Sequence, residues 1–131
     1  MNNSDYKELK VWQKSMDLTA EIYRLVKFLP REETYALSDQ LRRASVSIPS
    51  NIAEGHGRDS DKEFVKFLCI AKGSLFEVET QLLLSNRLNM INENDTVNAF
   101  QLITEIGKMI NSLIKYRQCL IPKAQSPKPK A

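Results

Sequence analysis

Apolar side chains recur at helical spacing in four stretches of the chain, and no stretch shows the alternating pattern of a strand. The first stretch covers about Lys7 to Phe28, the second begins between Glu32 and Ala36 and reaches Gly55, the third runs from Asp59 to near Asn89, and the fourth begins between Asn94 and Thr96 and ends before Pro122. The pattern therefore predicts four helices of about 20 to 30 residues, roughly 30 to 45 Å each.

Each predicted helix has one dominant apolar stripe that we expect to face the core. In chain order the stripes comprise Val11, Trp12, Ser15, Leu18, Thr19, Ile22, Tyr23 and Val26; Leu37, Leu41, Ala44, Ile48 and Ile52; Phe64, Phe67, Leu68, Ala71, Leu75, Val78 and Leu82; and Leu102, Ile103, Ile106, Met109, Ile110, Leu113 and Ile114. Short connections between long helices make neighbours antiparallel. The sequence thus predicts an all-α fold, an antiparallel up-down-up-down four-helix bundle.

Several residues mark the expected ends and irregularities of the helices. Pro30 stops the first helix, Gly55 begins the sequence that closes the second, and Ser60 with Glu63 fits a capping box at the start of the third. Pro49 lies inside the second helix, where its missing N–H predicts a kink. We expect residues 1–122 to form the bundle domain and the Lys/Pro-rich residues 123–131 to form a disordered tail.

The second and third helices carry more apolar residues than one core stripe requires. These second stripes comprise Val46, Pro49 and Ala53 on the second helix and Val65, Cys69, Phe76 and Leu83 on the third. Large exposed apolar patches are rare on soluble monomers, so the stripes predict an oligomer interface. The alternative is that the third helix is simply the most buried of the four.

Charge and composition narrow the possible functions. The chain of 131 residues has a formal net charge of +3, and Lys123, Lys128 and Lys130 in the tail account for all of it. Any affinity of the bundle for nucleic acid must therefore come from local clustering of charge. The chain contains no apolar run long enough for a membrane span and no secretory signal, so we expect a cytoplasmic protein. Cys69 and Cys119 are expected to be buried thiols, with a disulfide as the alternative.

Residues with catalytic potential are few. His56 is the only histidine and lies between two glycines, where we expect a solvated loop residue rather than a general base. Glu77 and Glu79 are two positions apart on a helix and so face different ways. The chain has no Glu-x-x-His sequence for a di-metal centre and no phosphate-binding glycine loop. We therefore expect no catalytic residues, no metal and no cofactor, and a non-enzymatic function with no small-molecule substrate.

Arg42, Arg43 and Arg58 are the candidate nucleic-acid-binding residues, because guanidinium groups bind phosphate well. The alternative is that they pair with Asp39, Glu54 or Asp59 on neighbouring turns. Gln40 and Asn51 at the edge of the core stripe are interpreted as amides that set the register of the bundle.

The second helix also carries a family resemblance. The run Gln40-Leu41-Arg42-Arg43-Ala44, followed by Ser47-Ile48-Pro49-Ser50-Asn51-Ile52-Ala53-Glu54-Gly55 and Arg58, resembles the signature of the 23S ribosomal RNA intervening-sequence proteins. Flanking pieces agree, among them Leu9-Lys10-Val11-Trp12, Glu33-Thr34-Tyr35-Ala36-Leu37 and Ile70-Ala71-Lys72-Gly73-Ser74-Leu75. The resemblance covers about Leu9 to Leu120; Leu29 and Ala36 depart from it, at positions where phenylalanine and glycine are expected.

The resemblance implies a four-helix bundle that assembles into a homopentameric ring in bacteria. It also implies a relationship to the accessory protein of diversity-generating retroelements, which is associated with nucleic acid and reverse transcriptase. Two functions remain open at this point. One is an oligomeric accessory protein that binds structured RNA or a nucleic-acid-processing protein; the other is a homo-oligomeric scaffold that binds another protein and has no nucleic-acid role.

Overall fold

The computed structural model describes residues 5–34 and 36–122, and these residues form four long helices. The helices are α1 (Lys10–Leu25), α2 (Leu37–His56), α3 (Asp61–Arg87) and α4 (Val97–Cys119). A short 3-10 helix, Tyr6–Glu8, precedes α1, and three others lie in the connections, at Val26–Phe28, Arg31–Glu33 and Glu93–Thr96. The described residues contain no strand. The predicted all-α fold is confirmed, while the predicted tail, 123–131, lies outside the described residues.

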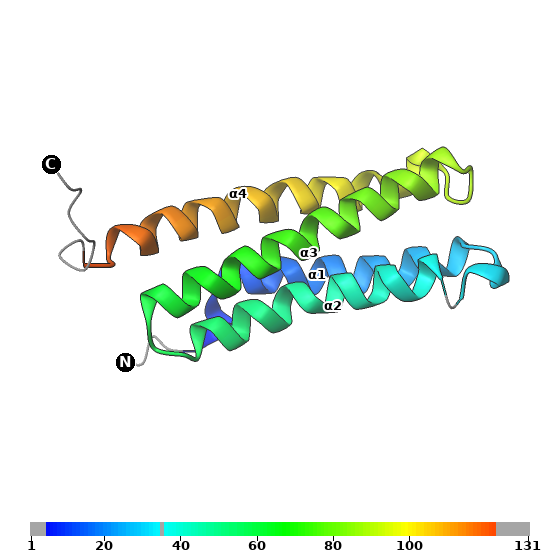
Figure 1. The fold of residues 1–131 in the computed structure, drawn as a ribbon. Coiled ribbons are helices and arrows are strands. Elements are labelled where there is room, and N and C mark those ends of the chain that lie inside the picture. The colour runs from blue at the N-terminus through cyan, green and yellow to red at the C-terminus, as the bar shows by residue number, and fades with distance from the viewer. Residues whose placement is uncertain (1–4, 35, 123–131) are drawn as a thin grey trace, which may run out of the picture.

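Successive helices run in opposite directions, so the connectivity is up-down-up-down, as predicted (Figure 1). Each helix packs on the next, and α4 also packs on α1 and closes the bundle. The most extensive contact is between α2 and α3. The described residues therefore form one elongated bundle with a single core along its axis.

The core consists mainly of the predicted apolar stripes, joined by Leu25, Leu29, Ile91 and Ala99, which the stripes did not include. Its largest fully buried side chains are Leu18, Ile22, Leu25, Leu41, Ile48, Ile52, Phe64, Leu68, Leu75, Leu82, Ile106 and Ile110. Burial of each such side chain contributes about 1.5–3 kcal/mol, so these residues dominate the stability of the fold. Eight predicted core residues differ. Six of them are half-buried at the margin of the core: Trp12, Thr19, Leu102, Met109, Leu113 and Ile114. Tyr23 is exposed at the edge of the α1 stripe, and Phe67 is only half-buried, on the flank of α3 that meets α2.

The turn between α2 and α3 contains the predicted cap. The Ser60 hydroxyl accepts a hydrogen bond from the backbone N–H of Glu63 at 3.2 Å, which satisfies one free donor at the start of α3. Helix α2 ends at His56, but Gly57 keeps a helical φ of −76°. The left-handed residue of this turn is Asp59, at φ 58°, a conformation that aspartate tolerates better than most residues.

Helix α2 continues through Pro49. Proline has no N–H to donate to the carbonyl four positions earlier, and that carbonyl belongs to the fully buried Ser45. The hydroxyl of Thr19 in α1 lies 2.9 Å from this carbonyl oxygen and donates to it, and it also lies 3.0 Å from the carbonyl of Ser15 in its own helix. The acceptor that Pro49 frees thus becomes a polar link between α1 and α2. The predicted kink stays a prediction.

Candidate nucleic-acid and self-association surfaces

Much of the serine- and asparagine-rich sequence of α2 is used in packing against α3. The hydroxyl groups of Ser47 in α2 and Ser74 in α3 are 2.8 Å apart and share a hydrogen bond. The Asn51 side-chain amide donates to the Ser47 carbonyl at 2.8 Å and to its hydroxyl at 2.9 Å. This network fixes the register of α2 on α3, the role expected of Asn51.

Gly55 permits the close approach of the same two helices. A Cβ atom added to Gly55 would lie 2.5 Å from the Cβ of Phe67 and 3.1 Å from a ring carbon of Phe64, both in α3. The first distance is far below van der Waals contact, so no larger residue fits without a shift of the backbone. The glycine is therefore required by helix packing rather than by the turn that follows it.

Arg42 and Arg43 lie on the first half of α2 and share one carboxylate. The Arg43 guanidinium contacts Asp39 at 3.0 Å, while its side chain remains 79% exposed. The Arg42 guanidinium lies 4.0 Å from Asp39 and donates to the Thr34 carbonyl at 3.3 Å, with 29% of its side chain exposed. Arg42 is thus partly engaged by the protein itself, whereas Arg43 remains accessible to solvent.

Arg58 lies at the other end of α2, in the turn to α3. It forms an ion pair with Glu54 at 2.8 Å, and its guanidinium lies 5.0 Å from the centre of the Phe67 ring. Fifteen positions separate it from Arg43, which at the rise of an α-helix is about 20 Å. The three candidate arginines therefore do not form one cluster. The carboxylate partners expected as the alternative are present for all three, and nucleic-acid binding by these residues stays a prediction.

The predicted interface residues differ in how far they are exposed in the single chain. Val46 on α2 and Phe76 and Leu83 on α3 are exposed by 41%, 53% and 54%, and Cys69 is also exposed. Ala53 and Val65 are half-buried.

Pro49 is buried in the single chain, so its assignment to an oligomer interface is wrong. Its ring lies on the flank of α2 where the Ser45 carbonyl meets α1, about 100° around the helix from the core stripe. An isolated helical wheel assigns that position to the outside because it omits the neighbouring helix.

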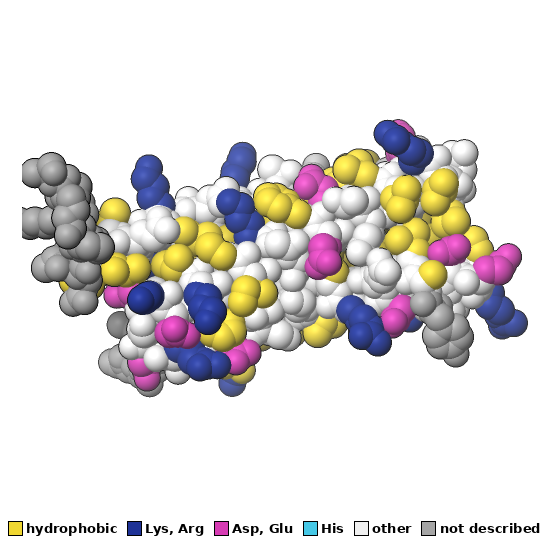
Figure 2. Space-filling model, in the orientation of Figure 1, with side chains coloured by type: hydrophobic (Ala, Val, Ile, Leu, Met, Phe, Trp, Pro, Cys, Tyr) yellow, Lys and Arg dark blue, Asp and Glu magenta, His cyan; other side chains and the backbone are white. Residues whose placement is uncertain are grey.

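Two of the exposed apolar patches lie on different flanks of the bundle; Ile70, Leu84 and Leu88 are further exposed apolar residues in or just after α3. Ser74 contacts α2, and Phe76 is two positions later, about 200° around α3, so Phe76 lies on the flank turned away from α2. Val46 precedes Ser47, which contacts α3, and its side chain lies on the outer surface of α2. We call Val46 and Ala53 the α2 patch, and Phe76 and Leu83 the α3 patch. Hydrophobic side chains over α3 are visible as separate groups in Figure 2.

A shallow polar groove runs between α2 and α3. It has a volume of about 240 Å³ and is lined by Gln40, Arg43, Ala44, Ser47, Ser74, Glu77 and Gln81. The Gln81 side-chain amide nitrogen donates to the Gln40 side-chain oxygen, Oε1, at 3.4 Å, whereas the buried Gln81 Oε1 has no hydrogen-bond partner among the described residues. The groove lies beside the Ser47–Ser74 contact and continues the polar seam between the two helices.

The structure corrects two expectations about reactive side chains. Both cysteines are exposed and free, not buried: Cys69 lies on the outer surface of α3, more than about 100° around the helix from the centre of the core stripe, and Cys119 lies in the last turn of α4, beyond its last buried residue. His56 is the last residue of α2 rather than a solvated loop residue. Its ring packs edge-on against Phe64 at 5.5 Å, and its Nδ1 has no hydrogen-bond partner among the described residues.

In residues 5–34 and 36–122, no three or more His, Cys, Asp or Glu side chains are grouped so that they could hold a metal ion. No helix within these residues combines the length and the apolar character that a membrane span needs.

Fold and surface together define a small up-down-up-down four-helix bundle with large apolar side chains on its outer faces. The model of one family, the 23S rRNA-intervening sequence proteins, matches residues 7–112. The chain therefore belongs to this family, as the sequence resemblance indicated. A solved structure from Bacteroides thetaiotaomicron, a protein of unknown function from the S23 ribosomal protein family, is 33% identical, with a TM-score of 0.74 over 80% of this chain and 98% of that one. No curated protein matches the chain significantly.

Proposed function

We propose that this protein is a non-enzymatic accessory protein that associates with copies of itself and binds structured RNA. The observation that carries the proposal is the pair of apolar patches on different flanks of one subunit. Side chains such as Phe76 and Leu83, more than half exposed on a rigid helix, are expected to be covered by a partner. RNA is the proposed ligand because the family is named for an intervening sequence of ribosomal RNA.

The placement of the patches favours a ring. A two-fold dimer uses one self-complementary patch on both subunits, whereas two different patches suit a head-to-tail contact that closes into a cycle. In the proposed assembly the α2 patch of one subunit covers the α3 patch of the next. The homopentamer implied by the family resemblance is an assembly of this kind. Two exposed free thiols suit a reducing compartment, and we place the protein in the cytoplasm on that account.

The self-association can be tested by disabling each patch in turn. Wild-type protein should have a mass several times the 15.0 kDa of the chain in light scattering. Val46→Asp disables the α2 patch, and Phe76→Asp with Leu83→Asp disables the α3 patch; both variants should be helical monomers. Tyr23→Asp, on α1 and 45% exposed, is the matched control and should assemble like the wild type.

Mixing the two monomeric variants tests the head-to-tail contact itself. Each variant retains one intact patch, so an equimolar mixture should give a dimer of twice the 15.0 kDa chain mass and nothing larger. A wild-type protein that is monomeric at micromolar concentration would refute self-association. Wild-type RNA binding is measured separately, by fluorescence anisotropy with a hairpin at low salt. An oligomer that binds no RNA but retains another protein through nuclease treatment and high salt would favour the scaffold alternative.

A further inference from the structure

Charge is unevenly distributed along the bundle, although the described domain is almost neutral overall. Residues 64–76 in α3 and 106–122 in and after α4 contain lysine and arginine but no aspartate or glutamate. The chain directions place these two segments side by side, because the first half of α3 lies against the second half of α4 (Figure 1). This part of the α3–α4 face is therefore basic. It is bounded by Asp61 and Glu63 in the first turn of α3 and, toward the other end, by Glu77, Glu79 and Glu105.

Two contacts fix the register of α3 on α4. Arg117 pairs with Asp61 at 2.7 Å, and a Cβ atom on Gly107 would lie 3.6 Å from the Leu75 side chain. In this antiparallel register Lys72 is level with Lys108, and Lys66 is level with Lys115. The two levels are about 10 Å apart along the axis, and the two helices are separated by about 8–10 Å. We call these four residues, Lys66, Lys72, Lys108 and Lys115, the lysine face.

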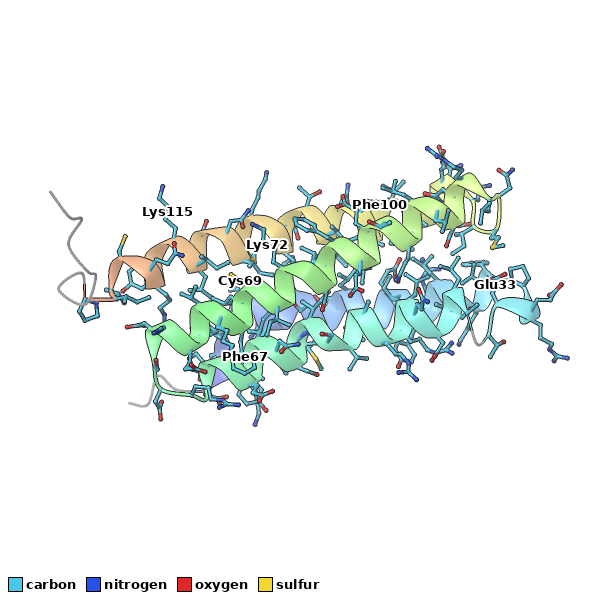
Figure 3. All side chains as sticks on the ribbon, in the orientation of Figure 1. Glu33, Phe67, Cys69, Lys72, Phe100 and Lys115 are labelled. Atoms are coloured by element: carbon cyan, nitrogen blue, oxygen red, sulfur yellow. The ribbon has the colours of Figure 1, made fainter. Side chains whose placement is uncertain are left out.

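The four side chains are available for binding. Lys66, Lys108 and Lys115 are exposed, and Lys72 is half-buried, with its ammonium group 5.9 Å from the centre of the Phe76 ring. Among the described residues no carboxylate lies within 4.0 Å of any of them. Lys115 projects outward from α4, and Lys72 projects from the side of α3 near α4 (Figure 3). The three candidate arginines, Arg42, Arg43 and Arg58, by contrast, each lie within 4.0 Å of a carboxylate.

We propose that the lysine face is the surface that contacts the phosphates of structured RNA; this inference rests on the proposed function. Lys108 and Lys115 share one face of α4, Lys72 lies on the side of α3 near α4, and Lys66 lies about 120° farther around α3 on its outer surface. Ammonium groups with no carboxylate partner, held on a rigid scaffold, fit the regularly spaced phosphates of a paired RNA stem. A membrane surface would also require an apolar face free to enter the lipid, whereas in the proposed assembly the exposed Phe76 and Leu83 of α3 are covered by the next subunit. The lysine-rich residues 123–131 continue the chain from this same basic end.

The lysine face and the α3 patch are adjacent but separate. Phe76 and Leu83 follow Lys72 toward the other end of α3, so a partner subunit can cover the patch and leave Lys66, Lys108 and Lys115 open to solvent. Val65 and Cys69, also predicted as interface residues, lie within the basic half of α3. The proposed self-contact accordingly relies on Phe76 and Leu83.

The test compares three full-length variants that each lose three positive charges. The first carries Lys66→Gln, Lys108→Gln and Lys115→Gln on the lysine face; the second carries Lys27→Gln, Arg31→Gln and Arg87→Gln at the opposite end, all exposed positions; the third carries Lys123→Gln, Lys128→Gln and Lys130→Gln in the tail. Affinity for an RNA hairpin with an uninterrupted stem is measured by fluorescence anisotropy at several salt concentrations. Circular dichroism and light scattering confirm that each variant retains its helices and its mass.

We expect the lysine-face variant to lose affinity on the order of 10²-fold at 0.1 M salt, with a salt slope shallower by about 3, because each phosphate contact adds about one unit of slope. The opposite-end variant should change affinity by only a few fold. An equal loss in these two variants, or a loss confined to the tail variant or to Arg42→Ala with Arg43→Ala, would refute the lysine face while RNA binding stands. A wild-type protein that binds no hairpin at low salt would instead refute the proposed function.

Discussion

The hydrogen bond from Thr19 to the Ser45 carbonyl should stabilise the fold only because Pro49 leaves that carbonyl free. Thr19→Val keeps the shape of the side chain and removes its only donor. Ser45 is fully buried. In the Thr19→Val variant its carbonyl therefore loses its hydrogen-bond donor in α1, and Pro49 has no N–H to replace it. An unsatisfied buried acceptor costs about 1–3 kcal/mol, and we expect Thr19→Val to lower the free energy of unfolding by about 1–2 kcal/mol.

Pro49→Ala provides the second side of a double-mutant cycle. The alanine introduced by this substitution has an N–H that can donate to the Ser45 carbonyl within α2, so Thr19→Val in the Pro49→Ala background should cost less than about 0.5 kcal/mol. The coupling energy is then about 1 kcal/mol. Urea unfolding followed by circular dichroism, at one fixed protein concentration, gives all four stabilities. Thr80→Val, at an exposed position of α3, is the control and should change stability by less than about 0.5 kcal/mol. Equal costs of Thr19→Val in both backgrounds would refute the link.

Two further predictions concern the core and the α2–α3 contact. Ile48→Asp or Leu75→Asp, each at most 1% exposed, should abolish cooperative thermal unfolding because an unpaired charge in the core costs several kcal/mol; native-like melting of either variant would contradict the assigned helix faces. Gly55→Ala should destabilise the protein by about 1–3 kcal/mol in urea unfolding, because the added Cβ atom would lie 2.5 Å from the Cβ of Phe67. Gly73→Ala is the control: a Cβ atom there meets nothing within 4 Å, so this variant should be as stable as the wild type or more stable.

Periodicity was sufficient to predict the four helices, their order and most of the core, because a buried helix must place an apolar residue on the same face every turn. It was not sufficient at the flanks. Pro49 lies about 100° from the core stripe of α2, and Phe67 lies about 60° from the centre of the stripe of α3; whether such a residue is buried depends on the position of the neighbouring helix. Tyr23 shows the opposite error, since it belongs to the α1 stripe by spacing and yet lies beyond the reach of the adjacent helices.

The candidate sites could be predicted less well than the fold. The sequence favours Arg42, Arg43 and Arg58 as binding residues because they lie in or beside the distinctive run of α2. Many residues of that run are explained by packing against α1 and α3. The lysine face has a sequence signal, the absence of acidic residues from 64–76 and 106–122. The signal becomes informative only when the antiparallel register places the two segments level with each other.

The charge distribution and the two apolar patches explain how an almost neutral subunit can bind a polyanion. A uniform neutral surface would give little net attraction, whereas a subunit with one basic end attracts phosphate there and repels it at the other end. A cyclic head-to-tail assembly keeps all subunits in the same orientation relative to its axis, so every basic end repeats around the ring. Weak contacts at each lysine face then add up through multivalency, and the affinity for an extended RNA depends on the assembly. Self-association and RNA binding would in that case be two consequences of one arrangement, in which α3 supplies Phe76 and Leu83 to the neighbouring subunit and Lys66 to the ligand.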